Sequence, residues 1–327
     1  MGATPMIKTS IIITTHHRPH LLPRAVESAR AAGTGVEIVV VDDASTDETA
    51  EVCKNLVGIN YVRVEHNQKV AGARNVGLVA SHGEYLSFLD DDDTRLPDSL
   101  DRQIDLFEQA PDAGLIYGQA IVKSGGSLPS RSYPDECPQG DIFWKLLSRN
   151  FIPCGSVVFR RSCLSRVGLL DDRIPGLDDW DLWVRIAETF PVIAIGTPVT
   201  VWERSSPASG QGTSDATQLV SFGARQFHQC WMNLSRASNA PGDARRAAWR
   251  DFSENMAAHL IWESARAFRE RQINQAIRNL ATLPRLHPLA TARIVKRRAL
   301  GFLNRKLRDS SAGPNPRPIE HRANTKL

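Results

Sequence analysis

Four consecutive aspartates follow an apolar stretch in SFLDDDDTRLPD, residues 87–98. Carboxylates at that density repel one another and are unfavourable in a folded protein unless a cation or a hydrogen-bonding ligand offsets their charge. Hard oxygen ligands select Mg²⁺ or Mn²⁺, and Mg²⁺ is typically held by one or two protein carboxylates together with phosphate oxygens. The run Asp90–Asp93 therefore predicts a site for a divalent cation and a diphosphate. A loop of solvated aspartates is the simpler alternative.

A second acidic pair, Asp42-Asp43, follows the apolar stretch VEIVVV at 36–41. In open α/β sheets the functional crevice lies outside the carboxyl ends of the strands. Two strands that both end in carboxylates favour a ligand site over a solvated loop, because both ends then face the same crevice.

Buried strands alternate with helical segments over the first two hundred residues, which predicts one Rossmann-like, mostly parallel α/β sheet covered on both faces. The expected strands are 10–14, 36–41, 84–89, 114–118, 156–160 and 192–196. Helices are expected from about residue 22, over 70–80, and over a segment that has Pro97 in its first turn. Their inward-facing residues are expected to be Leu22, Val26, Ala29, Leu100, Ile104 and Phe107. The sequence STDE predicts a capping box, with Ser45 as N-cap and Glu48 at N3.

The composition changes near residue 205, where a polar segment rich in Gly, Ser and Pro begins. We expect a sheet domain over 1–205, a helical C-terminal region over 206–308 with its longest helix at 244–268, and a disordered polar tail over 309–327.

The overall composition is that of an ordinary globular protein, with 42% hydrophobic residues and a formal charge of +4. That charge is too small to favour nucleic-acid binding by itself, and no nucleic-acid partner is expected. The five cysteines form no CxxC pair, which favours a reducing cytoplasm over a disulfide framework or a zinc site. No signal peptide or membrane span is recognised.

Two chemistries fit the aspartate run. Asp90-x-Asp92-x-Thr94 after an apolar strand resembles the nucleophile loop of haloacid-dehalogenase-type phosphatases, in which one Asp attacks phosphate and the second acts as acid and base. That loop usually closes the first strand of its domain, whereas a full strand–helix–strand unit precedes it here.

The second chemistry is sugar transfer. The ordered set IIITTHHRP, VVVDDASTDET, AGARNVG, GEYLSFLDDDD and GLDDWDLWVRI, spread over residues 8–205, resembles the family-2 inverting glycosyltransferases of the A-type nucleotide-diphospho-sugar transferase fold. The resemblance implies Mn²⁺- or Mg²⁺-dependent transfer from a nucleotide-sugar donor to a saccharide or lipid-linked acceptor, in cell-surface polysaccharide or glycolipid synthesis. An inactive binding module on the same fold is a further alternative.

The resemblance also implies roles for residues at the first three motifs. Thr14 would touch the nucleoside, Arg18 would lie near the diphosphate, and Arg74 would approach the nucleotide. Asp43 would accept a hydrogen bond from a uracil-like base, which makes a UDP-sugar the preferred donor, with GDP and dTDP left open.

The aspartate run corresponds to the family's DxD motif. Asp90 would contact the donor, Asp91 would lie near the ribose, Asp92 would bind the metal, and Asp93 would lie behind the metal ligands. Relatives often carry a histidine near the metal in the region of TVWERSSP, and this chain has none there, so Glu203 and Arg204 are considered as helpers.

The motif GLDDWDLWVRI supplies the base that inverting transfer needs to deprotonate the acceptor hydroxyl. The family usually shows Glu-Asp at this point, and this chain shows Asp178-Asp179. A carboxylate at a helix start stays ionised, and a neighbouring carboxylate raises its basicity. Asp179 is therefore assigned as the base, Asp178 as a residue that orients donor or acceptor, and Trp180 as a stacking surface for a sugar. For Trp183 a core position is expected.

The segment 292–308 combines apolar residues with a series of basic ones and has no acid: Arg293, Lys296, Arg297, Arg298, Arg305, Lys306 and Arg308. Such a segment fits either a solvated helix face or peripheral contact with an anionic membrane at the inner face of the plasma membrane.

Overall fold

The computed structural model describes residues 8–123, 131–203, 215–286 and 292. The chain divides into two compact units, Met1–Met256 and Ala257–Leu327. The unit that contains the sheet therefore extends past the boundary expected at residue 205, while the expected tail 309–327 lies outside the described residues.

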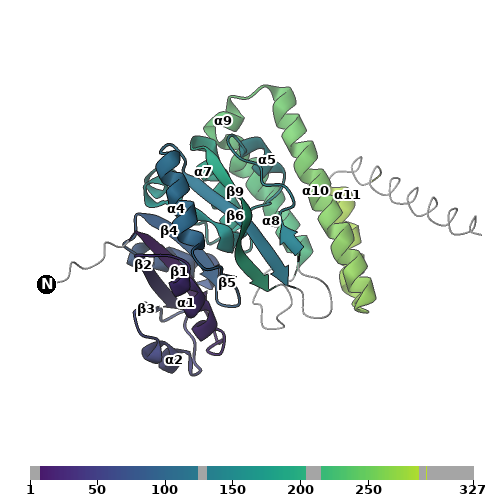
Figure 1. The fold of residues 1–327 in the computed structure, drawn as a ribbon. Helices are drawn as coiled ribbons and strands as arrows, with labels where there is room; N and C mark the ends of the chain where they lie inside the picture. The colour runs from purple at the N-terminus through teal and green to yellow at the C-terminus, as the bar shows by residue number, and fades with distance from the viewer. Residues whose placement is uncertain (1–7, 124–130, 204–214, 287–291, 293–327) are drawn as a thin grey trace, which may run out of the picture. The chain divides into compact units, whose positions relative to one another are not determined.

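The N-terminal half of the sheet is parallel (Figure 1). Its strands, in spatial order, are β3 (Ile59–Arg63), β2 (Val36–Asp42), β1 (Thr9–Thr15) and β4 (Tyr85–Asp90). In the register, Thr14 of β1 lies between Val41 and Asp90 of its two neighbours. Because these strands are parallel and aligned in register, the loops that follow β1, β2 and β4 all begin at the same edge of the sheet.

The second half of the sheet is mixed. β8 (Val158–Arg160) runs antiparallel between β4 and β6 (Leu115–Lys123), and β9 (Val192–Glu203) is parallel to β6. Two short strands, β5 (Thr94–Arg95) and β7 (Arg131–Tyr133), pair antiparallel with β9 and β6. The single α/β sheet expected from the sequence is confirmed, and the antiparallel pairings are confined to this half.

Four helices of the first unit pack against the sheet. They are α1 (Leu22–Ala31), α2 (Thr49–Asn55), α3 (Lys69–Ala80) and α4 (Ser99–Gln109). The inward-facing residues predicted for α1 and α4 are all buried, because side chains three or four positions apart share one helix face. Pro97 precedes α4 and does not lie in its first turn, since Asp98 is the N-cap.

The capping box predicted at Ser45 is wrong. Helix α2 begins at Thr49, and the backbone N–H of Thr49 donates to Oδ1 of Asp47. The hydroxyl oxygen of Ser45 instead accepts from the backbone N–H of His17, 2.9 Å away. A tertiary contact to the loop after β1 therefore takes the place of the local cap.

The rest of the first unit is mainly helical. It contains α5 (Phe143–Ser148), η1 (Cys154–Ser156), η2 (Arg161–Cys163), α6 (Leu164–Val167), α7 (Asp178–Thr189), α8 (Ala216–Gln229), η3 (Trp231–Asn233), α9 (Ser235–Ser238) and the first part of α10 (Gly242–Arg269). Aromatic side chains of α7, α8, η3 and α10 pack together, with Trp180, Phe227, Trp231 and Phe252 all buried. This aromatic cluster supports the first turns of α7.

The second unit contains the end of α10 and helix α11 (Ile273–Leu286). Among the described residues, no helix combines the length and the apolar composition that crossing a bilayer requires. Apart from Ala292, the basic segment 292–308 lies outside the described residues, so its membrane contact stays a prediction.

Candidate active site at the carboxyl edge of the sheet

Three carboxylates of the aspartate run converge where β4 ends. Asp90, Asp92 and Asp93 each offer an oxygen, and these oxygens all lie within 4.8 Å of one another. A turn closed by the Asp93 N–H and the Asp90 carbonyl (3.0 Å) brings them together. Asp92 and Asp93 are buried, while the side chain of Asp90 is 43% exposed, so one side of the group is open.

Burial opposes the negative charge of this group. Desolvation and the neighbouring Asp90 raise the pKa of Asp92 above its usual value, and the same two causes raise that of Asp93 further. One oxygen of Asp93 accepts from the backbone N–H of Glu203 (2.9 Å). Hard oxygen donors that are crowded and desolvated fit Mg²⁺ or Mn²⁺. Asp93, expected behind the metal ligands, thus lies in the group that could hold the ion with Asp92.

Asp91, the remaining aspartate of the run, has its own hydrogen-bond partners. Its two carboxylate oxygens accept from Thr15 Oγ1 (2.7 Å) and Arg18 Nη1 (2.8 Å), and the residue is buried. Burial raises the pKa of Asp91 to about 7, although Arg18 and Thr15 act in the opposite direction. Asp91 therefore anchors Arg18, and the ribose contact expected for Asp91 stays a prediction.

Two arginines lie beside the carboxylates. Arg18 Nη1 is 3.3 Å from Asp92 Oδ2 as well as being bonded to Asp91. Arg24, which was not predicted as a site residue, donates to the backbone carbonyl of Asp92. Its Nη1 lies 3.7 Å from Oε1 of Glu203. The structure thus brings Arg18 to the cluster, where a diphosphate beside a cation would be within its reach.

Asp43 lies beside the end of β1. Its backbone N–H donates to the Thr15 carbonyl (2.9 Å), and its Oδ1 accepts from the backbone N–H of Gln68 (2.6 Å), the N-cap residue of α3. Burial raises the pKa of Asp43 above its usual value. Thr14, one residue before Thr15, is partly exposed at the same edge. The nucleoside contacts expected for Thr14 and Asp43 stay predictions.

His16 and His17, which sequence reasoning left out, link Asp43 to the loop after β2. The Thr46 N–H donates to His17 Nε2 (3.0 Å), and His17 Nδ1 and His16 Nε2 are 2.9 Å apart. His16 Nδ1 in turn lies 2.6 Å from the Asp43 carbonyl. Because the backbone N–H can only donate, this chain of bonds assigns both imidazoles as neutral donors through Nδ1. The paired histidines thus support the Asp43 backbone.

Arg74 lies between two aspartates from different elements. Its Nη2 donates to Asp90 Oδ1 (2.7 Å) and its Nη1 to Asp178 Oδ2 (2.9 Å), while its guanidinium carbon lies 5.3 Å from the centre of the Phe88 ring. The residue is 5% exposed. Arg74 was expected to approach the nucleotide, and the structure instead uses its two terminal nitrogens to join the end of β4 to the start of α7.

Asp178 and Asp179 are the first two residues of α7. Asp178 is buried against Arg74, whereas Asp179 is partly open to solvent and accepts from the backbone N–H of Trp180 (2.6 Å). Desolvation by surrounding protein groups and the charge of Asp178 raise the pKa of Asp179 to about 7, while Arg74 acts in the opposite direction. Asp179 is thus a carboxylate whose basicity suits proton abstraction near neutral pH.

Trp180 is part of the aromatic cluster and is not a sugar platform. It is 4% exposed, its Nε1 donates to the Leu146 carbonyl (2.7 Å), and its ring centre lies 5.0 Å from that of Trp231. The stacking role expected for Trp180 is therefore wrong, because Trp231 of η3 and Phe252 of α10 pack against the ring. Trp183 is fully buried, and its core position is confirmed.

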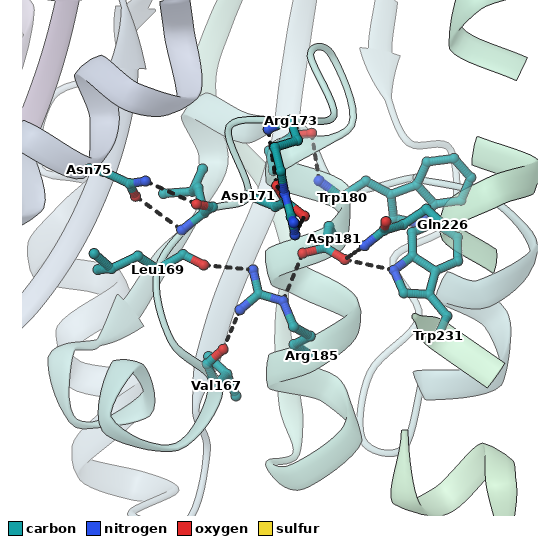
Figure 2. A network of polar contacts seen from close by, with 12 residues as sticks. Asn75, Val167, Leu169, Asp171, Arg173, Trp180, Asp181, Arg185, Gln226 and Trp231 are labelled. Carbon is teal, nitrogen blue, oxygen red and sulfur yellow. Dashed lines mark hydrogen bonds and ion pairs between the residues drawn. The ribbon is translucent and has the colours of Figure 1, made fainter. Parts of the chain in front are cut away.

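On another side of α7, Asp181 is at the centre of a polar network (Figure 2). Its Oδ1 accepts from Gln226 Nε2 (2.7 Å) and Trp231 Nε1 (2.8 Å), and its Oδ2 accepts from Arg185 Nε (2.7 Å). Arg185 also donates to the carbonyls of Val167 and Leu169. This network fixes the loop before α7 to the helix.

A cavity of about 420 Å³ opens over this network. Its walls are the 169–173 loop, the second turn of α7, the end of α8 and η3. Asp171 and Arg173 pair at its rim, and Asp172 is exposed there. The cavity therefore combines polar rim groups with apolar walls, and it lies on the same helix as Asp179.

Residues 10–168 match the sequence model of the family described as Glycosyl transferase family 2. A curated relative from Haemophilus influenzae, an uncharacterized glycosyltransferase, is 27% identical over 58% of this chain and 66% of its own length. A UDP-Glc:alpha-D-GlcNAc-diphosphoundecaprenol beta-1,3-glucosyltransferase from Escherichia coli is 29% identical over 54% of this chain and 69% of its own.

Solved structures show the same fold at low identity. TarS of S. aureus, in a complex with UDP-GlcNAc, superposes with a TM-score of 0.61 at 15% identity, covering 85% of this chain and 81% of TarS residues 1–349. A mannosyltransferase from Pyrobaculum calidifontis, in a complex with GDP-Man and Mn²⁺, superposes with a TM-score of 0.56 at 18% identity. The superposition covers 91% of this chain and 83% of the mannosyltransferase chain. By contrast, the chain aligns with only 32% of the length of a Rickettsia conorii relative.

Proposed function

Because this chain belongs to glycosyltransferase family 2, we propose that it moves a sugar from a nucleoside-diphosphate donor to an acceptor hydroxyl with inversion, in one displacement. The observation that carries the proposal is the clamp formed by Arg74. It joins the carboxylate group at the end of β4 to the helix start that carries Asp179. The carboxylate group that would hold a cation therefore lies next to the candidate base.

Asp179 acts as the base in this proposal. It takes the proton from the acceptor hydroxyl while that oxygen bonds to the anomeric carbon. The bond between the anomeric carbon and the diphosphate oxygen breaks at the same time, and the nucleoside diphosphate leaves with the electron pair. Attack from the side opposite the leaving group inverts the anomeric centre. General-base help of this kind typically contributes about 10²–10⁴-fold in rate.

The departing diphosphate gains negative charge. Asp92, with Asp90 and Asp93, would hold Mg²⁺ or Mn²⁺, and such an ion neutralises charge on phosphoryl oxygens. Arg18 lies beside Asp92 and would bind the diphosphate from the other side. Asp43, with Thr14 nearby, would contact the nucleoside.

A UDP-sugar is the donor we favour, because Asp43 suits a uracil edge and TarS was solved with UDP-GlcNAc. The names of the Escherichia coli relative and of a Campylobacter jejuni relative, 32% identical over 38% of this chain and 41% of its own length, describe transfer to undecaprenol-linked saccharides. We therefore propose a saccharide or lipid-linked acceptor in surface polysaccharide or glycolipid synthesis.

The test is nucleotide release from a panel of UDP-, GDP- and dTDP-sugars, with Mn²⁺, with Mg²⁺ and with EDTA. We expect slow hydrolysis of one donor that stops in EDTA, together with metal-dependent binding of the matching nucleoside diphosphate in calorimetry. The same panel includes p-nitrophenyl phosphate. Phosphomonoester hydrolysis with no nucleotide binding would support the phosphatase alternative, and neither activity nor binding would support an inactive module.

A further inference from the structure

We propose that Arg74 is a positioning residue for sugar transfer, which holds the start of α7, with Asp179, against the acidic end of β4. The inference rests on the proposed function, since it concerns the residue proposed there as the base. It departs from the expectation that an arginine in the motif AGARNVG approaches the nucleotide.

The geometry leaves Arg74 little freedom. The side chain is 6% exposed, and its two terminal nitrogens donate to carboxylates 16 and 104 residues away in the chain, Asp90 and Asp178. The planar guanidinium presents its nitrogens as a rigid fork, which suits two simultaneous acceptors better than a lysine ammonium would. The face of the group is covered by Phe88. A nucleotide could reach Arg74 only after one of these bonds had broken.

The charges around Asp179 explain why the clamp affects chemistry. The groups that act on it are Asp178 on its own helix, Arg74 on α3, Asp90 on β4 and the Cys154 thiol on η1. Arg74 is the cation of this set, and it neutralises Asp178, which would otherwise repel the charged form of Asp179. Without Arg74, the charge of buried Asp178 would be uncompensated beside Asp179, which would then hold a proton at the pH where a base must be free.

Carbon-13 NMR of protein labelled at the aspartate γ-carboxyl carbon measures this directly in the full chain. The Asp178 and Asp179 signals are assigned with Asp178→Asn and Asp179→Asn. In Arg74→Gln we expect the pair to take up its first proton at a pH about one unit or more higher than in the wild type. Asp178→Asn, which removes the repelling charge and keeps Arg74, is expected to move the Asp179 midpoint downward.

Arg102→Gln is the matched control, because Arg102 is exposed on α4 and its side chain donates only to the backbone carbonyl of Asp98, one helical turn earlier, among the contacts of the described residues. Its titration is expected to equal that of the wild type. Should Arg74→Gln fail to fold, Arg74→Lys supplies the test, since a lysine ammonium lacks the two rigidly spaced terminal nitrogens that reach Asp90 and Asp178 at once. We expect the pH at which the Asp178–Asp179 pair takes up its first proton to rise in Arg74→Lys as well, by less than in Arg74→Gln.

Calorimetry with UDP and Mg²⁺ separates positioning from nucleotide contact. We expect Arg74→Gln to bind UDP within about threefold of the wild type while its titration moves. A tenfold or larger loss of UDP binding with an unmoved carboxylate titration would overturn the inference and restore the nucleotide contact. If Asp179→Asn kept full transfer, the proposed function would fail, but the titration would still decide the role of Arg74.

Discussion

Asp179 and Asp181 lie two residues apart on α7 and belong to different kinds of site. Asp181 is buried, and three side-chain donors satisfy it: Arg185, Gln226 and Trp231 (Figure 2). Asp179 accepts a backbone N–H, faces a second carboxylate, and has a raised pKa. The difference shows that the partners around each carboxylate, and not the residue type or the helix that carries it, determine whether its charge is compensated.

The electrostatic contrast follows from what each carboxylate is paired with. Asp181 has a cation at 2.7 Å on the next turn of the same helix, so its charge is compensated locally. Arg74, the cation nearest to the start of α7, bonds Asp178 and Asp90 and reaches Asp179 only through space. Substitutions at the two positions should therefore affect different properties.

Asp179→Asn gives the largest expected effect on rate. Transfer should fall by about 10²–10⁴-fold because the acceptor hydroxyl loses its base. Thermal stability should be unchanged or higher, since a desolvated charge is removed. Steady-state transfer and a thermal melt measure the two quantities, with the exposed Asp112→Asn as control. Full turnover of Asp179→Asn on the true acceptor would exclude it as the base.

Asp181→Asn should show the reverse pattern. Removing the carboxylate leaves Arg185 without its partner and weakens the bonds from Gln226 and Trp231, which lowers the free energy of unfolding by about 3 kcal/mol. Denaturant unfolding measures this loss. Below the unfolding transition, UDP binding should match the wild type, because the side chain of Asp181 bonds Arg185, Gln226 and Trp231 and no residue of the proposed nucleotide site. A stable but inactive Asp181→Asn would break the comparison.

Asp92→Asn separates binding from chemistry. The group at the end of β4 would keep two carboxylates, and metal-dependent UDP binding should weaken by at least about 10–100-fold. Calorimetry with UDP and Mn²⁺, repeated in EDTA, measures the metal-dependent part. Asp179→Asn serves as the counterpart, since it should bind UDP normally. Equal binding by the wild type and Asp92→Asn would move the metal site elsewhere.

The pH profile gives the smallest of these effects. A base works in its deprotonated form, so kcat/KM should rise with pH through the Asp179 pKa of about 7 and level off above it. At pH 6 the rate should be roughly a tenth of the plateau. Donor binding measured over the same range controls for protonation elsewhere. A flat profile from pH 5.5 to 8 would show that Asp179 does not limit the reaction.

Sequence patterns located most of the residues at the site. Apolar runs placed the strands, and the carboxylates directly after two of those strands placed Asp43 and Asp90–Asp93 at one sheet edge, because parallel strands in register end together. The acidic start of α7 was also predicted. Each of these patterns spans only a few consecutive residues, so it can be recognised in the sequence without knowledge of the fold.

The tertiary structure decided what each residue contacts. Ser45 does not cap α2 because a loop from β1 uses its hydroxyl, and Trp180 is unavailable to a sugar because η3 and α10 cover it. Arg74 meets Asp178 across 104 residues. No local pattern encodes such contacts, because they depend on how the whole chain packs. The sequence by itself determined the elements and the reactive groups at their ends. Packing determined which of those groups are compensated and which remain free to react.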